Sequence, residues 1–385
     1  PAPGVASGSG GLTGHSSAGN MSVRSNISEM AREESSSILH HDMPVQEVEE
    51  DFSQFDDKYE LLGRGPLGEG TFGLVWRCKR KSSASKSSAS GDDGKELAAK
   101  IVRKARLQPR DVKNLLGEDG EVKIHLSLEH PHIVRLYECF DELITVTLVL
   151  DYCAGGDLFD AIQDKVKANG RGFQEKEAAW VASHLFLALL YLHSQQIVHR
   201  DIKTENILLQ LLDVPVEQNT FKLCDFGFAT HDRGHGLTDR LGSPDTTAPE
   251  VIAGNRYGTS SDLWSAGVLI FMMISARQPF YAPTDREVLL RVLAGRYRMN
   301  GELWDSVSHP PKVLISNLMT VDAKSRFTAI QALQSVWLKD IHLSVPLDEK
   351  GGRTCNFLEW QWPSTLMQAW YSPQDEANQP TRAAE

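Results

Sequence analysis

The sequence has 385 residues, of which 41% are hydrophobic, enough apolar content for one large or two small globular domains. The formal net charge is −11, but residues 1–57 alone hold ten acidic residues and two arginines, so the remainder is nearly neutral. Such a chain lacks the basic surface that attracts nucleic acids or anionic membranes, and we expect no nucleic-acid partner.

The most apolar stretch, AGVLIFMMISA at residues 266–276, is shorter than the roughly 18 residues of a membrane span. We therefore expect no membrane-spanning helix. The five cysteines are scattered and form no C-x-x-C pair, which favours a reduced compartment without structural zinc. A cytoplasmic or nuclear location is the expectation.

Residues 1–57 are rich in glycine, serine and acidic residues. So little apolar surface could not offset the entropy lost on ordering, and we predict a disordered leader. From Tyr59 to Ile101, alternating apolar and polar residues predict strands. A doubled KSSAS unit within residues 81–94 is typical of a flexible loop between them.

The stretch LLGRGPLGEGTFGLVW at residues 61–76 holds two overlapping G-x-G-x-x-G patterns. The second runs into the predicted strand LVWRCKR, so its glycines lie in a strand-loop-strand hairpin, which suits a cover over nucleotide phosphates. The first contains Pro66 and is interpreted as a turn. The hairpin pattern also needs a valine two residues beyond the last glycine and a lysine on the next strand, and Val75 and Lys100 occupy these positions.

Beyond this β-rich part, the hydrophobic period becomes helical in EVKIHLSL, KEAAWVASHLFLALLYLHSQ and SDLWSAGVLIFMMISA. Strands first and helices later predict an α+β, two-lobed arrangement. We place a small lobe at residues 58–150, a hinge at 151–156 and a large lobe at 157–338. Residues 339–385 hold three tryptophans and form a tail that either packs on the large lobe or inhibits it.

Two later motifs supply groups suited to phosphoryl transfer, which depends mainly on charge neutralisation, metal ions and positioning. In IVHRDIKTENILL, Asp201 can accept a hydroxyl proton, Lys203 can meet the transferred phosphate and Asn206 can hold Mg²⁺. In FKLCDFGFA, Asp225 is a second metal ligand, because Mg²⁺ prefers carboxylate and phosphate oxygens.

With these motifs the chain resembles the protein kinase family over residues 58–338, because GEGTFGLV, AAKI, HRDIKTEN, DFG and TAPE occur in the family's order. The resemblance implies a two-lobed kinase fold and an enzyme that uses ATP and Mg²⁺. Since HRDIKTEN carries Lys203, it implies transfer to serine or threonine. The implied nucleotide site comprises Leu67, Val75 and Ala98 around adenine, Gly68, Gly70, Phe72 and Gly73 over the phosphates, Leu150 as gatekeeper, Asp151 and Cys153 with backbone groups, and Asp157 near the ribose.

Lys100 is implied to bind the α- and β-phosphates and to pair with a glutamate of the following helix. Glu118 and Glu121 compete for this pairing. Glu121 stands ten residues before Pro131, as the family requires, and is assigned the role.

Further charges are implied to hold the scaffold and the activation loop. Glu250 should pair with Arg326, and Asp262 should hold the backbone of the catalytic loop. Asp239 stands near the place where many kinases carry an activating phosphothreonine, so we expect its carboxylate to attract Arg200.

Within the family, the helical part is most similar to the calmodulin-kinase group, in particular to calcium-dependent protein kinases. No D-x-[DN]-x-[DN]-G calcium loop occurs in this sequence, so direct calcium binding by this chain is not expected. The implied partners are proteins with serine or threonine targets. Basic residues upstream of the target are expected, because Asp157 and Glu205 match positions that bind arginine in basophilic relatives.

Two positions depart from the family pattern. Thr246 replaces the usual tyrosine, which we expect to loosen the substrate loop. His125 replaces an aliphatic residue in a stack with His199 and Phe226, where it is either an uncharged, packed side chain or one that weakens the active alignment. The alternatives to an active enzyme are a pseudokinase or a scaffold, which the presence of every catalytic residue disfavours.

Overall fold

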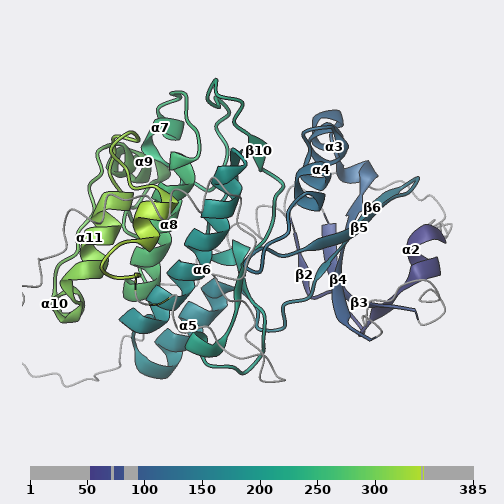
Figure 1. Ribbon diagram of the computed structural model, residues 1–385, viewed down its shortest axis with the longest axis horizontal. Coiled ribbons are helices and arrows are strands. Elements are labelled where there is room, and N and C mark those ends of the chain that lie inside the picture. The colour runs from purple at the N-terminus through teal and green to yellow at the C-terminus, as the bar shows by residue number, and fades with distance from the viewer. Residues whose placement is uncertain (1–52, 71–72, 82–93, 340, 342–385) are drawn as a thin grey trace, which may run out of the picture. The chain divides into compact units, whose positions relative to one another are not determined.

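The computed structural model describes residues 53–70, 73–81, 94–339 and 341. Figure 1 shows a β-sheet with helices α3 and α4 beside it, followed along the chain by a larger group of helices that includes α5, α6 and α8. The predicted α+β, two-lobed arrangement is confirmed. The described helices include none that is long and apolar enough to cross a membrane.

The small lobe is an antiparallel sheet in the order β1-β3-β4-β6-β5, with β2 paired to β3. Its apolar side chains form two clusters, one with Cys78 and Val149 and one with Val122 and Leu148. Its strands and helices are β1 (Tyr59–Leu62), β2 (Gly68–Glu69), β3 (Gly73–Arg80), β4 (Glu96–Arg103), α3 (Pro109–Leu116), α4 (Glu121–Leu126), β5 (Leu136–Asp141) and β6 (Thr145–Asp151).

The β2–β3 hairpin has the strand-loop-strand form inferred for the second glycine pattern. Gly68 pairs with Val75 across the hairpin. A side chain at Gly73 would place its Cβ 2.0 Å from the carbonyl oxygen of Ile101, so strands β3 and β4 can approach each other here only at a glycine. Phe72 lies outside the described residues.

Residues 53–57 differ from the predicted disordered leader, because they belong to helix α2 (Ser53–Lys58). Phe55 is fully buried and stacks on Tyr59 with ring centroids 5.5 Å apart. The Glu142 carboxylate accepts hydrogen bonds from the backbone N–H groups of Gln54 and Phe55, at 3.0 and 3.2 Å. One aromatic anchor therefore orders a segment whose average composition is polar and acidic. Residues 1–52 and 342–385 lie outside the described part of the chain.

The large lobe is organised around α6 and α8, which are buried on nearly every side and form the centre of one hydrophobic core. Two short strand pairs, β7 with β10 and β8 with β9, carry the loops described below. The elements are α5 (Leu158–Asn169), α6 (Glu175–Ser194), β7 (Ile197–Val198), β8 (Ile207–Leu209), β9 (Phe221–Leu223), β10 (Thr230–His231), α7 (Pro249–Ile252), α8 (Ser260–Ser275), α9 (Asp285–Leu293), α10 (Glu302–Ser306), α11 (His309–Leu318) and α12 (Ala329–Leu333).

Candidate active site

The loop between β7 and β8 gathers three of the predicted catalytic residues into one bonded set. Asp201 is buried, with 3% of its surface exposed. Its Oδ2 lies 2.6 Å from Lys203 Nζ and accepts a hydrogen bond of 3.0 Å from Asn206 Nδ2. Burial alone would lower the pKa of Lys203, but the Asp201 carboxylate outweighs this effect and raises it. The lysine therefore stays charged beside the carboxylate.

A second set joins the two lobes. Lys100 on β4 lies 2.9 Å from Glu121 on α4 and 3.4 Å from Asp225, which follows β9. Burial opposes the charge on Lys100, yet the two carboxylates raise its pKa. Burial would likewise raise the pKa of Asp225, but Lys100, His199 and the Gly227 N–H together lower it. Lys100 and Asp225 therefore stay charged beside each other near neutral pH.

The two sets are connected through the backbone, because the Cys224 N–H donates to the Asn206 carbonyl at 2.9 Å. Asp225 has a φ of 62° and Arg200 a φ of 69°, both in the left-handed region that non-glycine residues rarely adopt. Strain of this kind at two positions beside the reacting groups requires a compensating anchor.

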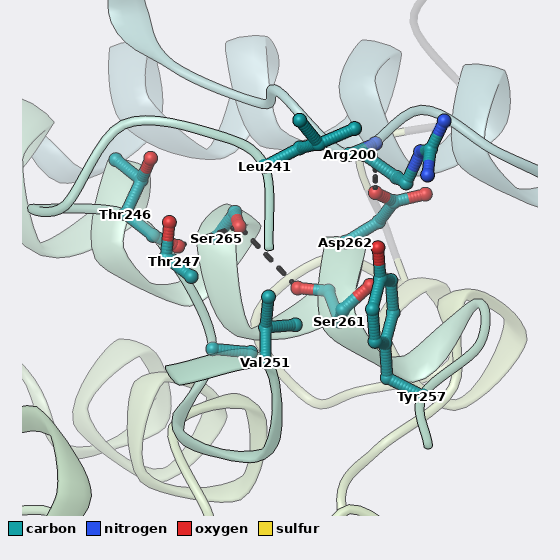
Figure 2. Close-up of a pocket in the computed structure, with 10 residues that line it drawn as sticks. Arg200, Leu241, Thr246, Thr247, Val251, Tyr257, Ser261, Asp262 and Ser265 are labelled. Carbon is teal, nitrogen blue, oxygen red and sulfur yellow. Dashed lines mark hydrogen bonds between the residues drawn. The ribbon is translucent and has the colours of Figure 1, made fainter. Parts of the chain in front are cut away.

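Asp262 at the start of α8 supplies that anchor for Arg200. Its carboxylate accepts the backbone N–H of His199 at 3.0 Å and of Arg200 at 2.9 Å, and Figure 2 shows Asp262 lying beside Arg200. Burial would raise the pKa of Asp262, but His193, 2.9 Å away, helps to lower it. A charged carboxylate under the catalytic loop therefore fixes its conformation.

Of the residues assigned around adenine, Val75 and Ala98 lie on the adjacent strands β3 and β4, and Leu67 directly precedes β2. Ala98 on β4 pairs with Leu150 on β6, and the Leu67 N–H donates to the Val75 carbonyl at 2.7 Å. These contacts place apolar side chains from β3, β4 and β6 near one another. The Gly70 N–H donates to the Gly73 carbonyl at 2.8 Å, which closes the tip of the glycine loop.

The hinge residue Asp151 and Asp157, just beyond the hinge, have contacts that motif spacing could not reveal. The backbone N–H of Asp151 donates to the Arg135 carbonyl, so this N–H is not available to a nucleotide. The Asp151 carboxylate lies 3.2 Å from Lys95 and 3.0 Å from Lys222. Burial would raise its pKa, but Lys222 and its other partners lower it to about 2. Asp157 caps α5 by accepting the Asp160 N–H.

The donor set fits ATP with Mg²⁺. Both hydrogen bonds of the Asn206 side chain use its amide nitrogen, so the Asn206 Oδ1 oxygen and the Asp225 carboxylate are the groups that would hold the metal. Mg²⁺ is usually held by one or two carboxylates together with substrate phosphates rather than by an all-protein cage. Residues 53–70, 73–81, 94–339 and 341 contain no cluster of three acidic, histidine or cysteine ligands.

Comparison with known sequences decides the family. The family model described as Protein kinase domain matches residues 63–338, well over half of the chain. The chain belongs to the protein kinase family. The family as a whole uses ATP and Mg²⁺ and acts on protein substrates.

Individual relatives agree with the calmodulin-kinase group. The chain is 35% identical to the serine/threonine-protein kinase DCLK3 of Homo sapiens over 74% of this chain and 40% of that protein. It is 35% identical to calcium-dependent protein kinase 3 of Plasmodium berghei, over 77% of this chain and 49% of that one. It is 31% identical to calcium/calmodulin-dependent protein kinase type 1 of Macrobrachium nipponense, over 80% and 83%. The chain thus spans about half or less of the first two relatives.

The activation segment of this kinase domain is held by a carboxylate of its own. Arg200 Nη1 lies 3.2 Å from Asp239 Oδ2, and the Tyr257 hydroxyl donates to the Asp239 carbonyl at 2.7 Å. Arg200 also donates to the Phe228 carbonyl. One arginine therefore connects the catalytic loop, the segment after Asp225 and the activation segment.

We expect Asp239→Ala to lower kcat about two- to fivefold, because an exposed ion pair contributes at most about 1 kcal/mol. Thr238→Ala should retain the wild-type rate, since the neighbouring threonine need not be phosphorylated. Initial rates on a serine peptide would measure both variants. An unchanged rate in Asp239→Ala would contradict this role.

Thr246 does not leave the substrate loop unsupported. The residue is buried, its N–H donates to the Ser243 carbonyl at 3.1 Å and its carbonyl accepts from Ser265 Oγ at 2.7 Å. Thr246 and Ser265 both line the small cavity whose residues are drawn in Figure 2. Ser243 Oγ in turn lies 3.4 Å from Asp201 Oδ1. The expected loosening is thus opposed by a hydrogen bond from Ser265 of α8.

Proposed function

We propose that this chain is an ATP-dependent serine/threonine protein kinase that transfers the γ-phosphate to hydroxyl groups of protein substrates. The observation that carries the proposal is the pair of connected sets, Asp201 with Lys203 and Asn206, and Lys100 with Glu121 and Asp225. Each role that phosphoryl transfer requires is filled by a residue of suitable charge. Relatives named as serine/threonine kinases support the same activity.

Each residue of the two sets has its own role in this reaction. Asp201 accepts the proton of the attacking hydroxyl, while Lys203 and Asn206 fix its carboxylate. Lys100, held by Glu121, orients the α- and β-phosphates. Asn206 and Asp225 would hold Mg²⁺, which neutralises phosphate charge when it is bound.

We further propose that substrates carry arginine upstream of the target residue. Burial raises the pKa of Asp157, and the nearby carboxylates of Asp160 and Glu205 raise it further. The pKa of Asp245 is also raised by burial, and Glu205 contributes to that shift as well. These carboxylates therefore gather in one region, where a guanidinium group would relieve their mutual repulsion.

A cycle of enzyme and peptide variants tests this preference. We expect Glu205→Gln to raise the KM of an arginine-containing serine peptide about three- to tenfold, since each charge pair lost at a partly exposed site is worth about 1 kcal/mol. For a peptide with glutamine in place of arginine, the Glu205→Gln substitution should leave the KM unchanged. Glu217→Gln, an exposed change elsewhere on the large lobe, is the matched control. Equal KM changes for both peptides would rule out recognition of arginine by Glu205.

We also propose that this chain acts without binding calcium itself and that it resides in the cytoplasm or nucleus. The four described cysteines are free thiols. Burial raises the pKa of Cys78 and of Cys153 to about 12, so these thiols are inert. Such chemistry supports a structural role for the cysteines in a reducing compartment.

A further inference from the structure

His125 is a polar side chain in the packed interior between the lobes. It lies on α4, one turn beyond Glu121, and only 3% of its surface is exposed. Its Nε2 atom is 2.6 Å from the carbonyl oxygen of Val134. Since a carbonyl oxygen only accepts, Nε2 carries the proton and donates it. Nδ1 has no hydrogen-bond partner among the described residues.

This hydrogen bond reaches the strand that leads to the metal ligand. Val134 is itself buried, with 2% exposed, and its N–H donates to the carbonyl of Leu223 at 2.9 Å. Leu223 is the last residue of β9 and stands two positions before Asp225. Val134 therefore connects α4, through its carbonyl, with β9, through its N–H.

The imidazole ring makes a second connection to the same region. Its centroid lies 4.5 Å from the ring of Phe226, which in turn lies 5.0 Å from His199. His199 Nε2 contacts the Cys224 carbonyl at 3.1 Å. An aliphatic side chain could fill the space against Phe226, but it could not donate to Val134.

We propose that His125 is a positioning residue, whose Nε2–H bond to the Val134 carbonyl fixes α4 against β9 and thereby holds Glu121 within reach of Lys100. The role does not require His125 to touch nucleotide or substrate. Its catalytic consequence rests on the proposed kinase function, whereas its structural consequence does not. The imidazole thus replaces part of the apolar packing at this position with a directional bond.

Substitutions at His125 separate the hydrogen bond from the packing. His125→Leu fills the space with an apolar side chain and loses the donor, whereas His125→Gln keeps an N–H at nearly the same distance from the backbone. Ile124→Val is the control, because Ile124 is buried on the same helix and loses one methylene group without touching the bond. Backbone hydrogen exchange of α4 is measured without nucleotide, and kcat and KM are measured with a serine peptide.

A buried acceptor that loses its donor is costly, so we expect His125→Leu to speed exchange of the α4 amides about tenfold. Its kcat should fall by a similar factor while the KM of the peptide is unchanged. His125→Gln should stay within about threefold of wild type in both measurements, and Ile124→Val should resemble it. The proposal would be overturned if the α4 amides of His125→Leu exchanged at the wild-type rate. It would also be overturned if those of His125→Gln exchanged as fast as those of His125→Leu. If the variants show the predicted exchange pattern but the wild-type protein transfers no phosphate, the positioning role is supported and the kinase function is refuted.

Discussion

Asp201→Asn is expected to lower kcat by about 10²- to 10⁴-fold, because the amide cannot accept the proton of the attacking hydroxyl. The KM for ATP should change little, since the nucleotide contacts assigned above do not include Asp201. The Asn206 bond to this side chain needs only an acceptor, which asparagine retains. The loss should therefore appear in the chemical step, measured as initial rates at saturating ATP and peptide.

Asp213→Asn is the matched control for this change. Asp213 is exposed in the large lobe and has a φ of 56°, a conformation that asparagine tolerates as well as aspartate does. The rate of the Asp213→Asn variant should equal that of wild type. A comparable loss in both variants would indicate damage to the fold, and a near-normal rate in Asp201→Asn would remove Asp201 from the role of base.

Arg326→Met is expected to lower the free energy of unfolding by about 3–5 kcal/mol, the cost of breaking a buried ion pair. The Arg326 side chain is fully buried, and its two terminal nitrogens lie 2.7 and 2.8 Å from the Glu250 carboxylate. It also donates to the carbonyls of Thr320 and Ser260, at 3.0 and 2.8 Å. Methionine leaves all these acceptors without a donor. Urea unfolding measures the change.

Removing both charges should cost less than the two single losses together. In Glu250→Leu with Arg326→Met, no unpaired charge remains buried, although the carbonyls of Thr320 and Ser260 still lack their donor. In a double-mutant cycle the two substitutions should show a coupling free energy of a few kcal/mol, because the side chains are in contact. The double variant should be more stable than the sum of the two single effects predicts. Arg296→Met, an exposed change, should stay within about 0.5 kcal/mol of wild type. Additive effects of Glu250→Leu and Arg326→Met would show that the two side chains do not depend on each other.

The parts of the fold and site that the sequence predicts are those set by short-range spacing. Asp201, Lys203 and Asn206 lie within six residues, and one loop brings them together. The apolar periods of α6 and α8 extend over several turns, which makes their helical form plain from sequence. The glycine hairpin is likewise a local feature, because β2 and β3 are neighbours along the chain.

The parts that the sequence does not predict depend on contacts between distant residues. The order of α2 rests on Phe55 meeting Tyr59 and Phe140, which lies in a strand far along the chain. The environment of Asp151 depends on Lys222, 71 positions away. No local pattern marks either contact. His125 could be singled out as an unusual residue, but its partner is a backbone carbonyl, which every residue carries, so only the structure reveals the bond.

The central claim is that this chain transfers phosphate with its own residues and without calcium. The most direct test is phosphate transfer from Mg-ATP to an arginine-containing serine peptide in EGTA, measured beside Asp225→Ala and repeated with added calcium. We predict transfer in EGTA that calcium does not increase and that Asp225→Ala abolishes. No transfer by wild type in either condition, or equal transfer by wild type and Asp225→Ala, would contradict the claim and leave a protein that uses the kinase fold for binding alone.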